Sequence, residues 1–418
     1  MFYLRTSRQL RLLDLEAKSP LYTHFIDTIK GLATIRAFGW IDDEHAQNLK
    51  LLDTSQRPAY LLAMIQQCLM LVLNLLVAFL AVGLVSLATQ LETSTGFTGA
   101  SLVSLMSFSE IATALIFCYT ALKTSIGAVS RLKTFSDKVQ SEHQPGEDCE
   151  PPADWPQNGC MVLKNVSASH SSTFAPDAEG SFPALKNISL TIGAGERIAV
   201  CGRTGSGKSS LILFLLRLLD PIPTPGLSFT VDNIDILTVN RTALRSRIIA
   251  VPQECVFLPD GSTIKSNIDP TETIPDTECA DILDMVHLSV FVTAQGGLNA
   301  PMSGDQLSAG QQQLFSLGRA IYRRRARMRA SGRDGGVLLL DEISSSVDHD
   351  TEVLMHEIIS REFEAYSIVA VAHRLELMVG FVDRVVVLDK GCVVEEGRPR
   401  ELLEVEGGRF WKLYRAEQ

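Results

Sequence analysis

The chain has 418 residues, a length that allows two or three domains with buried cores. Its 48 Asp and Glu outnumber its 38 Lys and Arg, and the net charge of −10 excludes wholesale binding to nucleic acid. The densest basic stretch, residues 322–333, lacks an aromatic platform and is interpreted as a solvated helix end. The 8 cysteines form no CxxC pair, which argues against zinc or a disulfide framework and suits a reducing compartment.

Two apolar stretches dominate the first third of the chain. The N-terminal segment before them is charged throughout and is not a signal peptide. Residues 58–91 carry no charge and exceed the roughly 20 residues that cross a bilayer. Residues 97–122 form a second stretch that contains Glu110. A carboxylate at such a position either faces the interior of a helix bundle or has a role in transport, and the sequence leaves both open.

The charges around these stretches predict their orientation. Basic residues lie before the first stretch and after the second, while the loop 90–98 between them holds only Glu92. By the positive-inside rule both ends are cytoplasmic and the short loop is outside. The basic residues are Arg5, Arg8, Arg11, Lys18, Lys30, Arg36, Lys50, Arg57, Lys123, Arg131, Lys133 and Lys138. The sequence therefore predicts a membrane hairpin.

A segment rich in proline and acidic residues, 139–159, is expected to be a linker and a domain boundary. Beyond it, short β-rich runs alternate with helical patterns. This alternation predicts an α/β domain with a largely parallel sheet. The runs are RIAVC, IIAVPQ, VLLLDE, SIVAVAH, RVVVLD and CVVEE.

A glycine-rich loop follows the first of these runs and opens a helix. Its pattern, Gly202-x-x-x-x-Gly207-Lys208-Ser209, places backbone N–H groups around phosphates, a lysine charge beside them and a hydroxyl on Mg²⁺. Ser210 can reach the α-phosphate. The residues expected to bind a nucleoside triphosphate are Gly202, Arg203, Thr204, Gly205, Ser206, Gly207, Lys208, Ser209 and Ser210.

Polar residues end three other predicted strands. Asp341 is expected to bind Mg²⁺, and Glu342, the next residue, to act as general base on the attacking water. Gln253 can contact Mg²⁺ or water and report on the γ-phosphate. His373 is a candidate γ-phosphate contact. Gln253 and His373 are grouped with Glu342 as catalytic candidates, and Ser209, Gln253 and Asp341 form the expected metal site.

The stretch 307–311, LSAGQ, precedes a helical run. Ser308 suits an N-cap, and a helix N-terminus offers free N–H groups and the positive end of the helix dipole. An ordinary capped helix explains this pattern as well. A second anion-binding helix start becomes useful when it serves the ATP held by a different domain.

In this order the motifs resemble those of ATP-binding cassette (ABC) transporters. They are the phosphate loop, Gln253, LSAGQ as the signature, VLLLDE, SSVD at Ser345–Asp348, and His373. The family pairs its nucleotide-binding domains head to tail, which implies that Ser308 and Gly310 complete a partner's ATP site. Ala309 stands where the common signature has glycine.

The phrasing TSRQLRLLDLEAKSPLYTHF, with VCGRTGSGKSS and NIDPTETI, is most similar to subfamily C, the multidrug-resistance-associated type, and to its C-terminal half. The resemblance implies a partial transmembrane domain over 1–138, with a coupling-helix region at 15–40. After the linker it implies an ABC nucleotide-binding domain over 160–418. The expected fold is thus a membrane α-helical hairpin followed by an α/β P-loop NTPase domain of ABC type.

The family stacks adenine on an aromatic residue before the phosphate loop. The aligned position is His170, with Phe174 as the alternative. The cofactors that the resemblance implies are therefore ATP and Mg²⁺.

The resemblance implies ATP hydrolysis that drives export of small organic substrates, by an integral membrane protein of the plasma membrane or a vacuolar-type membrane. A complete exporter has about twelve core membrane helices and two nucleotide-binding domains, so the chain is expected to be a C-terminal fragment or a truncated product. Its expected partners are the first nucleotide-binding domain and remaining helices of a full transporter, or a second copy, and the lipid bilayer. The alternative is a non-transporting, membrane-tethered ATP-binding remnant.

Overall fold

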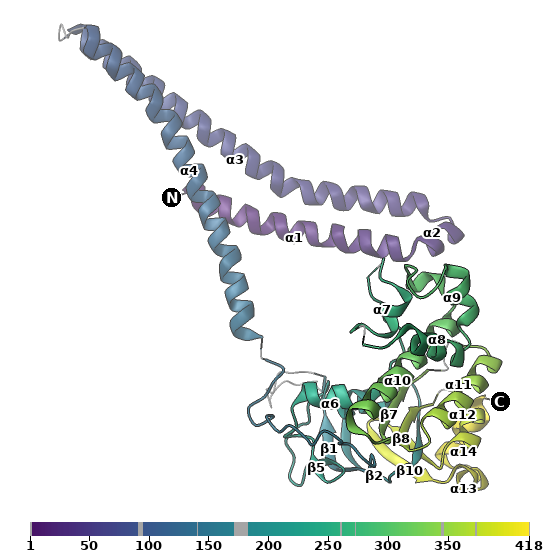
Figure 1. Ribbon diagram of the computed structural model, residues 1–418. Coiled ribbons are helices and arrows are strands. Elements are labelled where there is room, and N and C mark those ends of the chain that lie inside the picture. The colour runs from purple at the N-terminus through teal and green to yellow at the C-terminus, as the bar shows by residue number, and fades with distance from the viewer. Residues whose placement is uncertain are drawn as a thin grey trace. The chain divides into compact units, whose positions relative to one another are not determined.

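The computed structural model describes residues 2–90, 95–139, 141–170, 183–259, 261–271, 273–343, 347–372 and 374–417. The chain divides into two compact units, Met1–Gln140 and Ser141–Gln418. Figure 1 shows the first as long helices and the second as a mixed α/β unit. Each unit is described here by itself.

The described part of the first unit consists of helices joined by short turns. It consists of α1 (Phe2–Lys30), α2 (Leu32–Phe38), α3 (Ile41–Gln90) and α4 (Thr95–Lys138). Helix α1 packs along α3, and α3 also packs against α4 (Figure 1). His24 of α1 lies 3.4 Å from the carboxylate of Glu44 in α3. Gly39 ends α2 with a φ of 72°, a left-handed conformation that glycine adopts without strain.

Helices α3 and α4 contain the two predicted membrane stretches. Ile41–Gln90 and Gly96–Tyr119 are long and apolar enough to cross a membrane. Apolar side chains along both are exposed, including Phe79 at 79% and Met106 at 70%. Helix α3 begins 17 residues before the predicted stretch and continues through Pro58.

The second unit is built on a six-stranded sheet in the order β10-β9-β3-β8-β7-β6. Five strands are parallel and β10 runs antiparallel to β9, so the largely parallel sheet is confirmed. All six predicted runs form strands. Their bounds are β3 Arg197–Cys201, β6 Ile249–Val251, β7 Gly336–Asp341, β8 Tyr366–Val371, β9 Arg384–Asp389 and β10 Cys392–Gly397.

Two apolar cores cover the two faces of this sheet. Along β7, Leu338 and Leu340 belong to one core, while Val337 and Leu339 belong to the other, as the alternation of a strand requires. The first core takes side chains from α10 (Ala309–Ser331), α11 (His349–Glu362) and α12 (Leu375–Phe381). The second core takes them from α5 (Lys208–Leu215).

A second, antiparallel sheet completes the second core. Its order is β2-β1-β4-β5, formed by β1 (Met161–Ala168), β2 (Leu185–Ile192), β4 (Ser228–Val231) and β5 (Ile234–Asp235). The remaining elements are α6 Arg241–Arg247, α7 Ile264–Ile268, α8 Asp276–Met285, α9 Ser289–Gln295, the 3₁₀ turn η1 Gly304–Gln306, α13 Pro399–Glu404 and α14 Arg409–Glu417.

Most of the segment expected to be a linker, 139–159, packs into the second unit. Trp155 is 2% exposed and donates its indole N–H to the carbonyl of Val231 at 2.9 Å. The carboxylate of Asp232 accepts the backbone N–H groups of Asn158, Gly159 and Cys160. The compact unit therefore starts at Ser141.

Candidate nucleotide-binding site

The glycine-rich loop lies at the C-terminal end of β3, between two parallel neighbours, and α5 begins at Lys208. Gly202 has a φ of 153°, and a Cβ there would lie 2.3 Å from the carbonyl oxygen of Leu388. Gly207 has a φ of 105°, and a Cβ there would lie 2.9 Å from the carbonyl oxygen of Ala184. Both positions therefore require glycine, and the loop stays close to the neighbouring backbone.

Lys208 brings a positive charge to this loop. It is 9% exposed, and its Nζ donates to the carbonyl of Gly202 at 3.0 Å. The same Nζ lies 3.9 Å from Oε1 of Glu342. Because the ammonium is buried among backbone acceptors, it is held at the loop rather than free in solvent. Arg203, Thr204 and Gly205 are exposed, at the outer part of the loop.

Ser209 and Asp341 meet across the site. The Ser209 hydroxyl donates to Oδ1 of Asp341 at 3.4 Å. Burial and the neighbouring charge of Glu342 raise the pKa of Asp341 above its ordinary value. A hydroxyl and a crowded carboxylate are oxygen donors of the kind Mg²⁺ prefers, and a cation there would relieve the crowding. These two residues fit the predicted metal role.

Glu342 connects the catalytic candidates. It follows β7 with a φ of 47°, in the left-handed region that a non-glycine residue rarely occupies. Its Oε2 accepts a hydrogen bond from the side-chain amide of Gln253 at 2.9 Å. The structure therefore brings Gln253, Glu342 and Lys208 together. It places Gln253 on Glu342, so contact between Gln253 and Mg²⁺ stays a prediction.

His170 lies next to the phosphate loop. Its Nε2 is 3.0 Å from the Ser210 hydroxyl at the start of α5. The ring is exposed, as a residue that stacks on a ligand must be. Phe174, the alternative for adenine stacking, His373, the candidate γ-phosphate contact, and Ser345 of the SSVD motif lie outside the described residues. Their predicted roles stay predictions.

Ser308 caps α10 as the sequence predicts. Its hydroxyl accepts from the N–H of Gln311, and the Gln311 side chain accepts from the N–H of Ser308. Gly310 lies beside α11, where a Cβ would meet Thr351 at 3.6 Å. Within the part of the chain that the structure describes, no hydrogen bond joins Ser308 or Gly310 to the loop 202–210.

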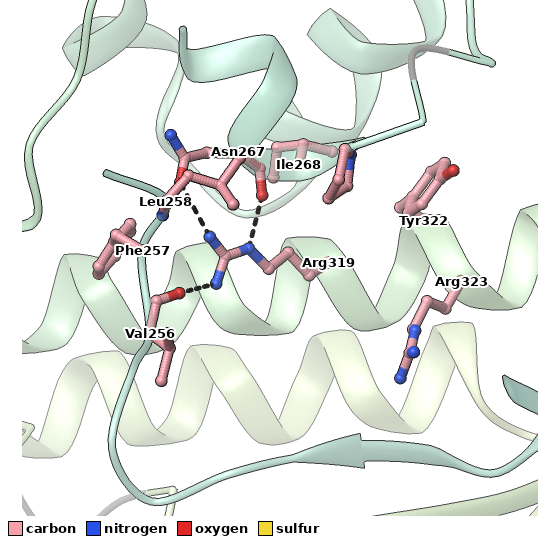
Figure 2. Close-up of a pocket in the computed structure, with 9 residues that line it drawn as sticks. Val256, Phe257, Leu258, Asn267, Ile268, Arg319, Tyr322 and Arg323 are labelled. Carbon is pink, nitrogen blue, oxygen red and sulfur yellow. Dashed lines mark hydrogen bonds between the residues drawn. The ribbon is translucent and has the colours of Figure 1, made fainter. Parts of the chain in front are cut away.

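Two residues of α10 make contacts that were not predicted from the sequence. The Gln313 amide donates to the carbonyl of Gln253 at 2.7 Å. Arg319 donates to the backbone carbonyls of Asn267 and Val256, which joins the segment 255–271 to the helix. Figure 2 shows Arg319 in the wall of a pocket of about 270 Å³. Neither residue stands out in the sequence, because each contact joins positions more than 50 residues apart.

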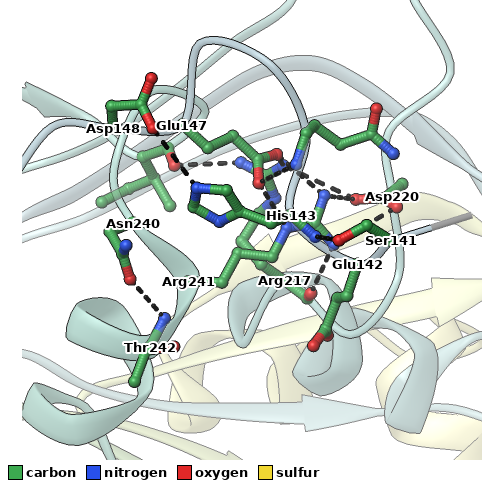
Figure 3. A network of polar contacts seen from close by, with 12 residues as sticks. Ser141, Glu142, His143, Glu147, Asp148, Arg217, Asp220, Asn240, Arg241 and Thr242 are labelled. Carbon is green, nitrogen blue, oxygen red and sulfur yellow. Dashed lines mark hydrogen bonds and ion pairs between the residues drawn. The ribbon is translucent and has the colours of Figure 1, made fainter.

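A buried charged cluster joins residues 141–159, the docked segment, to the rest of the second unit, outside the nucleotide site (Figure 3). Glu147 is 3% exposed and accepts from Arg217 at 2.5 Å and from Arg241 at 2.7 and 2.8 Å. Asp220 also accepts from Arg241. Burial opposes ionisation of Glu147, but the hydrogen bonds and charges of the arginines lower its pKa to about 2. Glu147 therefore anchors the docked segment as a carboxylate.

Known proteins share both parts of the chain. Residues 185–344 match the family described as ABC transporter, and residues 1–116 match the ABC transporter transmembrane region. The chain is 53% identical to the ABC-type transporter braE of Annulohypoxylon truncatum, over 99% of this chain and 29% of that protein. It is 42% identical to ABC multidrug transporter B of Aspergillus fumigatus, over 99% and 27%.

A solved structure has the same fold. It is a bacterial Atm1-family ABC exporter with ATP bound, which gives a TM-score of 0.80 at 20% identity and covers 99% of this chain and 71% of that one. The chain spans about three tenths of the length of the curated relatives it matches. The chain thus carries an ABC transporter transmembrane region followed by an ABC transporter domain.

Proposed function

We propose that the chain binds and hydrolyses ATP with Mg²⁺, and that hydrolysis drives export of small organic substrates as the C-terminal portion of an ABC transporter. One observation carries the proposal: a single edge of the sheet holds Lys208, Ser209, Asp341, Glu342 and Gln253 in one connected set. We also propose subfamily C, the multidrug-resistance-associated type. The sequence motifs quoted above support it.

Each residue of the set has a defined task. The backbone N–H groups of 202–207 and the Lys208 ammonium hold the β- and γ-phosphates. Ser209 and Asp341 hold Mg²⁺, which when bound neutralises phosphate charge. Glu342 accepts a proton from the attacking water at its carboxylate, and Gln253 orients that carboxylate. His373 contacts the γ-phosphate, and His170 stacks on adenine.

The signature serves a second nucleotide-binding domain. Ser308 caps α10 and leaves the first N–H groups of this helix available to an anion. The described contacts do not bring Ser308 or Gly310 to the chain's own phosphate loop. We propose that both residues complete an ATP site on a first nucleotide-binding domain or on a second copy of the chain.

The chain is proposed to be an integral membrane protein of the plasma membrane or a vacuolar-type membrane. Its nucleotide-binding domain is proposed to lie in the cytoplasm. The excess of basic residues at both outer ends of the membrane stretches supports this orientation. Under this proposal, the chain contributes only some of the helices of the translocation path, and the full transporter supplies the others.

ATP hydrolysis by the purified chain tests the proposal. It is measured in detergent or vesicles over a range of protein concentrations, beside Glu342→Gln. Activity that rises more than linearly with concentration and is lost in the variant supports a competent site completed by a second copy. ATP binding without hydrolysis at any concentration contradicts hydrolysis by the chain alone. The chain is then either a half-site that needs its missing partner or the tethered ATP-binding remnant.

A further inference from the structure

We propose that Gln313 is a positioning residue of the ATP site. From inside α10, its side-chain amide fixes the backbone of Gln253, so that the side chain of Gln253 reaches Glu342. The inference rests on the proposed function, because it assigns Gln313 a part in the same hydrolysis.

The contact of Gln313 differs from those of the two glutamines before it. Gln311 bonds to Ser308, and Gln312 donates to the carbonyl of Gly304 at 2.9 Å, so both stay near the start of their own helix. Gln313 is 4% exposed and reaches out of the helix, where its Nε2 donates to the carbonyl of Gln253 at 2.7 Å.

The segment that Gln313 holds is exposed around Gln253, and the next contact of α10 with it is that of Arg319 with the carbonyl of Val256. Pro252, Gln253 and Glu254 are all exposed. An exposed side chain without packing loses conformational entropy when it is held in one geometry. A buried amide that fixes its backbone lowers that cost, and Gln253 then donates to Oε2 of Glu342 at 2.9 Å.

The contacts form a continuous path from the signature helix to the phosphate loop. Gln313 bonds to Gln253, Gln253 to Glu342, and Glu342 lies 3.9 Å from the Nζ of Lys208. Helix α10 begins next to Ser308, which we propose faces a partner's ATP. A displacement of α10 is therefore passed to Glu342 through two side chains.

The other end of the Gln313 amide argues against a purely structural role. Its Oε1 is buried and has no hydrogen-bond partner in the described part of the chain. A buried acceptor without a donor is unfavourable, so an apolar side chain of similar volume would suit a packing role at least as well. An apolar side chain of this volume cannot donate a hydrogen bond, so only the amide supplies the bond from Nε2 to the carbonyl of Gln253.

The first test is Gln313→Met in the full chain, because methionine keeps the volume and removes the amide. Loss of positioning should lower kcat about tenfold and change KM for ATP less than about twofold, as expected when an interaction of the transition state is lost. The matched control is Ile282→Val, which truncates a fully buried side chain of α8 in the same core. It should leave kcat at the wild-type value. An equal loss of kcat in the control overturns the inference.

A double-mutant cycle separates positioning from packing. The substitution Gln253→Ala removes the side chain that reaches Glu342 but keeps the carbonyl that accepts from Gln313. In this background Gln313→Met should lower kcat by less than about twofold. The effects of two substitutions do not add when both residues act through the same contact. The same loss in both backgrounds shows that Gln313 does not act through Gln253, and overturns the inference.

Hydrogen exchange distinguishes failure of the inference from failure of the proposed function. If the wild-type chain hydrolyses no ATP at any concentration, hydrolysis by the chain alone fails on its own evidence. Amide hydrogen exchange of peptides covering 252–258 then tests the contact between Gln313 and the backbone of Gln253. Exchange about tenfold faster in Gln313→Met than in wild type supports the restraint. Unchanged exchange overturns it.

Discussion

At Glu342 the backbone and the side chain are both constrained. The left-handed φ of 47° directs the carboxylate, and Gln253 and Lys208 then hold its two oxygens. A non-glycine residue in this conformation costs free energy of roughly 1 kcal/mol or more, which the surrounding contacts must offset. Asp341, one residue earlier, points at Ser209, so consecutive carboxylates serve different partners.

Replacement of Glu342 by glutamine should separate binding from hydrolysis. The amide keeps the shape but cannot accept the proton of water, so hydrolysis should fall by about 10² or more while ATP affinity changes little. A fluorescent nucleotide measures binding and phosphate release measures hydrolysis. Loss of both in Glu342→Gln would show that the residue is needed for binding.

Asp341→Asn should stabilise the nucleotide-free chain and weaken its response to Mg²⁺. Burial and Glu342 raise the pKa of Asp341, so folding disfavours its charged form. Stability of wild type relative to Asp341→Asn should therefore fall as pH rises from the ordinary pKa of an aspartate through the raised one.

Thermal unfolding of both proteins between pH 4 and 8, with and without MgATP, measures these effects. At neutral pH the variant should melt a few degrees higher without ligand. It should gain less stability from MgATP than wild type. A lower melting temperature of the ligand-free variant would contradict the assignment of crowding at Asp341.

At the scale of elements, the docked segment behaves as part of the nucleotide-binding unit. Glu147 joins it to Arg217, which follows α5, and to Arg241 in α6. Both arginines are at most 5% exposed. A buried ion pair adds little net stability when it is intact, but removal of one partner leaves charges without compensation.

Glu147→Ala should lower the free energy of unfolding by about 3 kcal/mol, within the range for a broken buried pair. The control is Glu142→Ala in the same segment, where the carboxylate is 56% exposed and pairs with Arg245. It should cost less than about 1 kcal/mol. Denaturant unfolding measures both changes, and equal losses would contradict the anchoring role of Glu147.

The pH dependence follows from the same carboxylate. Its pKa of about 2 lies below the ordinary value of 4.5, so its contribution to stability is complete above pH 4.5 and is lost as pH falls toward 2. Wild type and Glu147→Ala should therefore converge in stability over that interval. A stability difference that persists unchanged down to pH 2 would exclude the ionised carboxylate as its source.

On the scale of the whole molecule, the two units differ in where their apolar side chains lie. The second unit buries them in two internal cores, and the first exposes them along α3 and α4. The second unit thus has the organisation of an independently folding domain, whereas exposed apolar helices require lipid or other helices.

Two fragments test the position of the boundary. A fragment of residues 141–418 should be soluble and bind ATP. A fragment of 160–418 lacks Trp155 and Glu147 and should melt at least several degrees lower. Equal melting temperatures would show that the docked segment contributes no stability. ATP affinity serves as the control, because both fragments keep the whole phosphate loop.

Much of the second unit could be predicted because its strands are continuous apolar runs that end in functional residues. The apolar run before Asp341 and the apolar run before Gly202 each predict a buried strand, and the residues that follow each run predict the site. The antiparallel sheet was not predicted, because β4 and β5 are short and their pairing with β1 depends on distant residues. Trp155 and Glu147 were assigned to a linker because the composition of 139–159 is typical of one. Composition does not show that these two side chains have buried partners distant in the sequence.

Helix α3 has a mechanical consequence that its sequence shows only in part. Residues 41–57 hold its charges, and at 1.5 Å per residue they extend about 25 Å before the uncharged stretch begins. They are continuous with that stretch in one helix, through Pro58. A change of tilt of about 10° within the lipid therefore moves the other end of the helix by about 4 Å. A helix that tilts as one body in this way acts as a lever, and it converts a small reorientation in the bilayer into a displacement longer than a hydrogen bond at its other end.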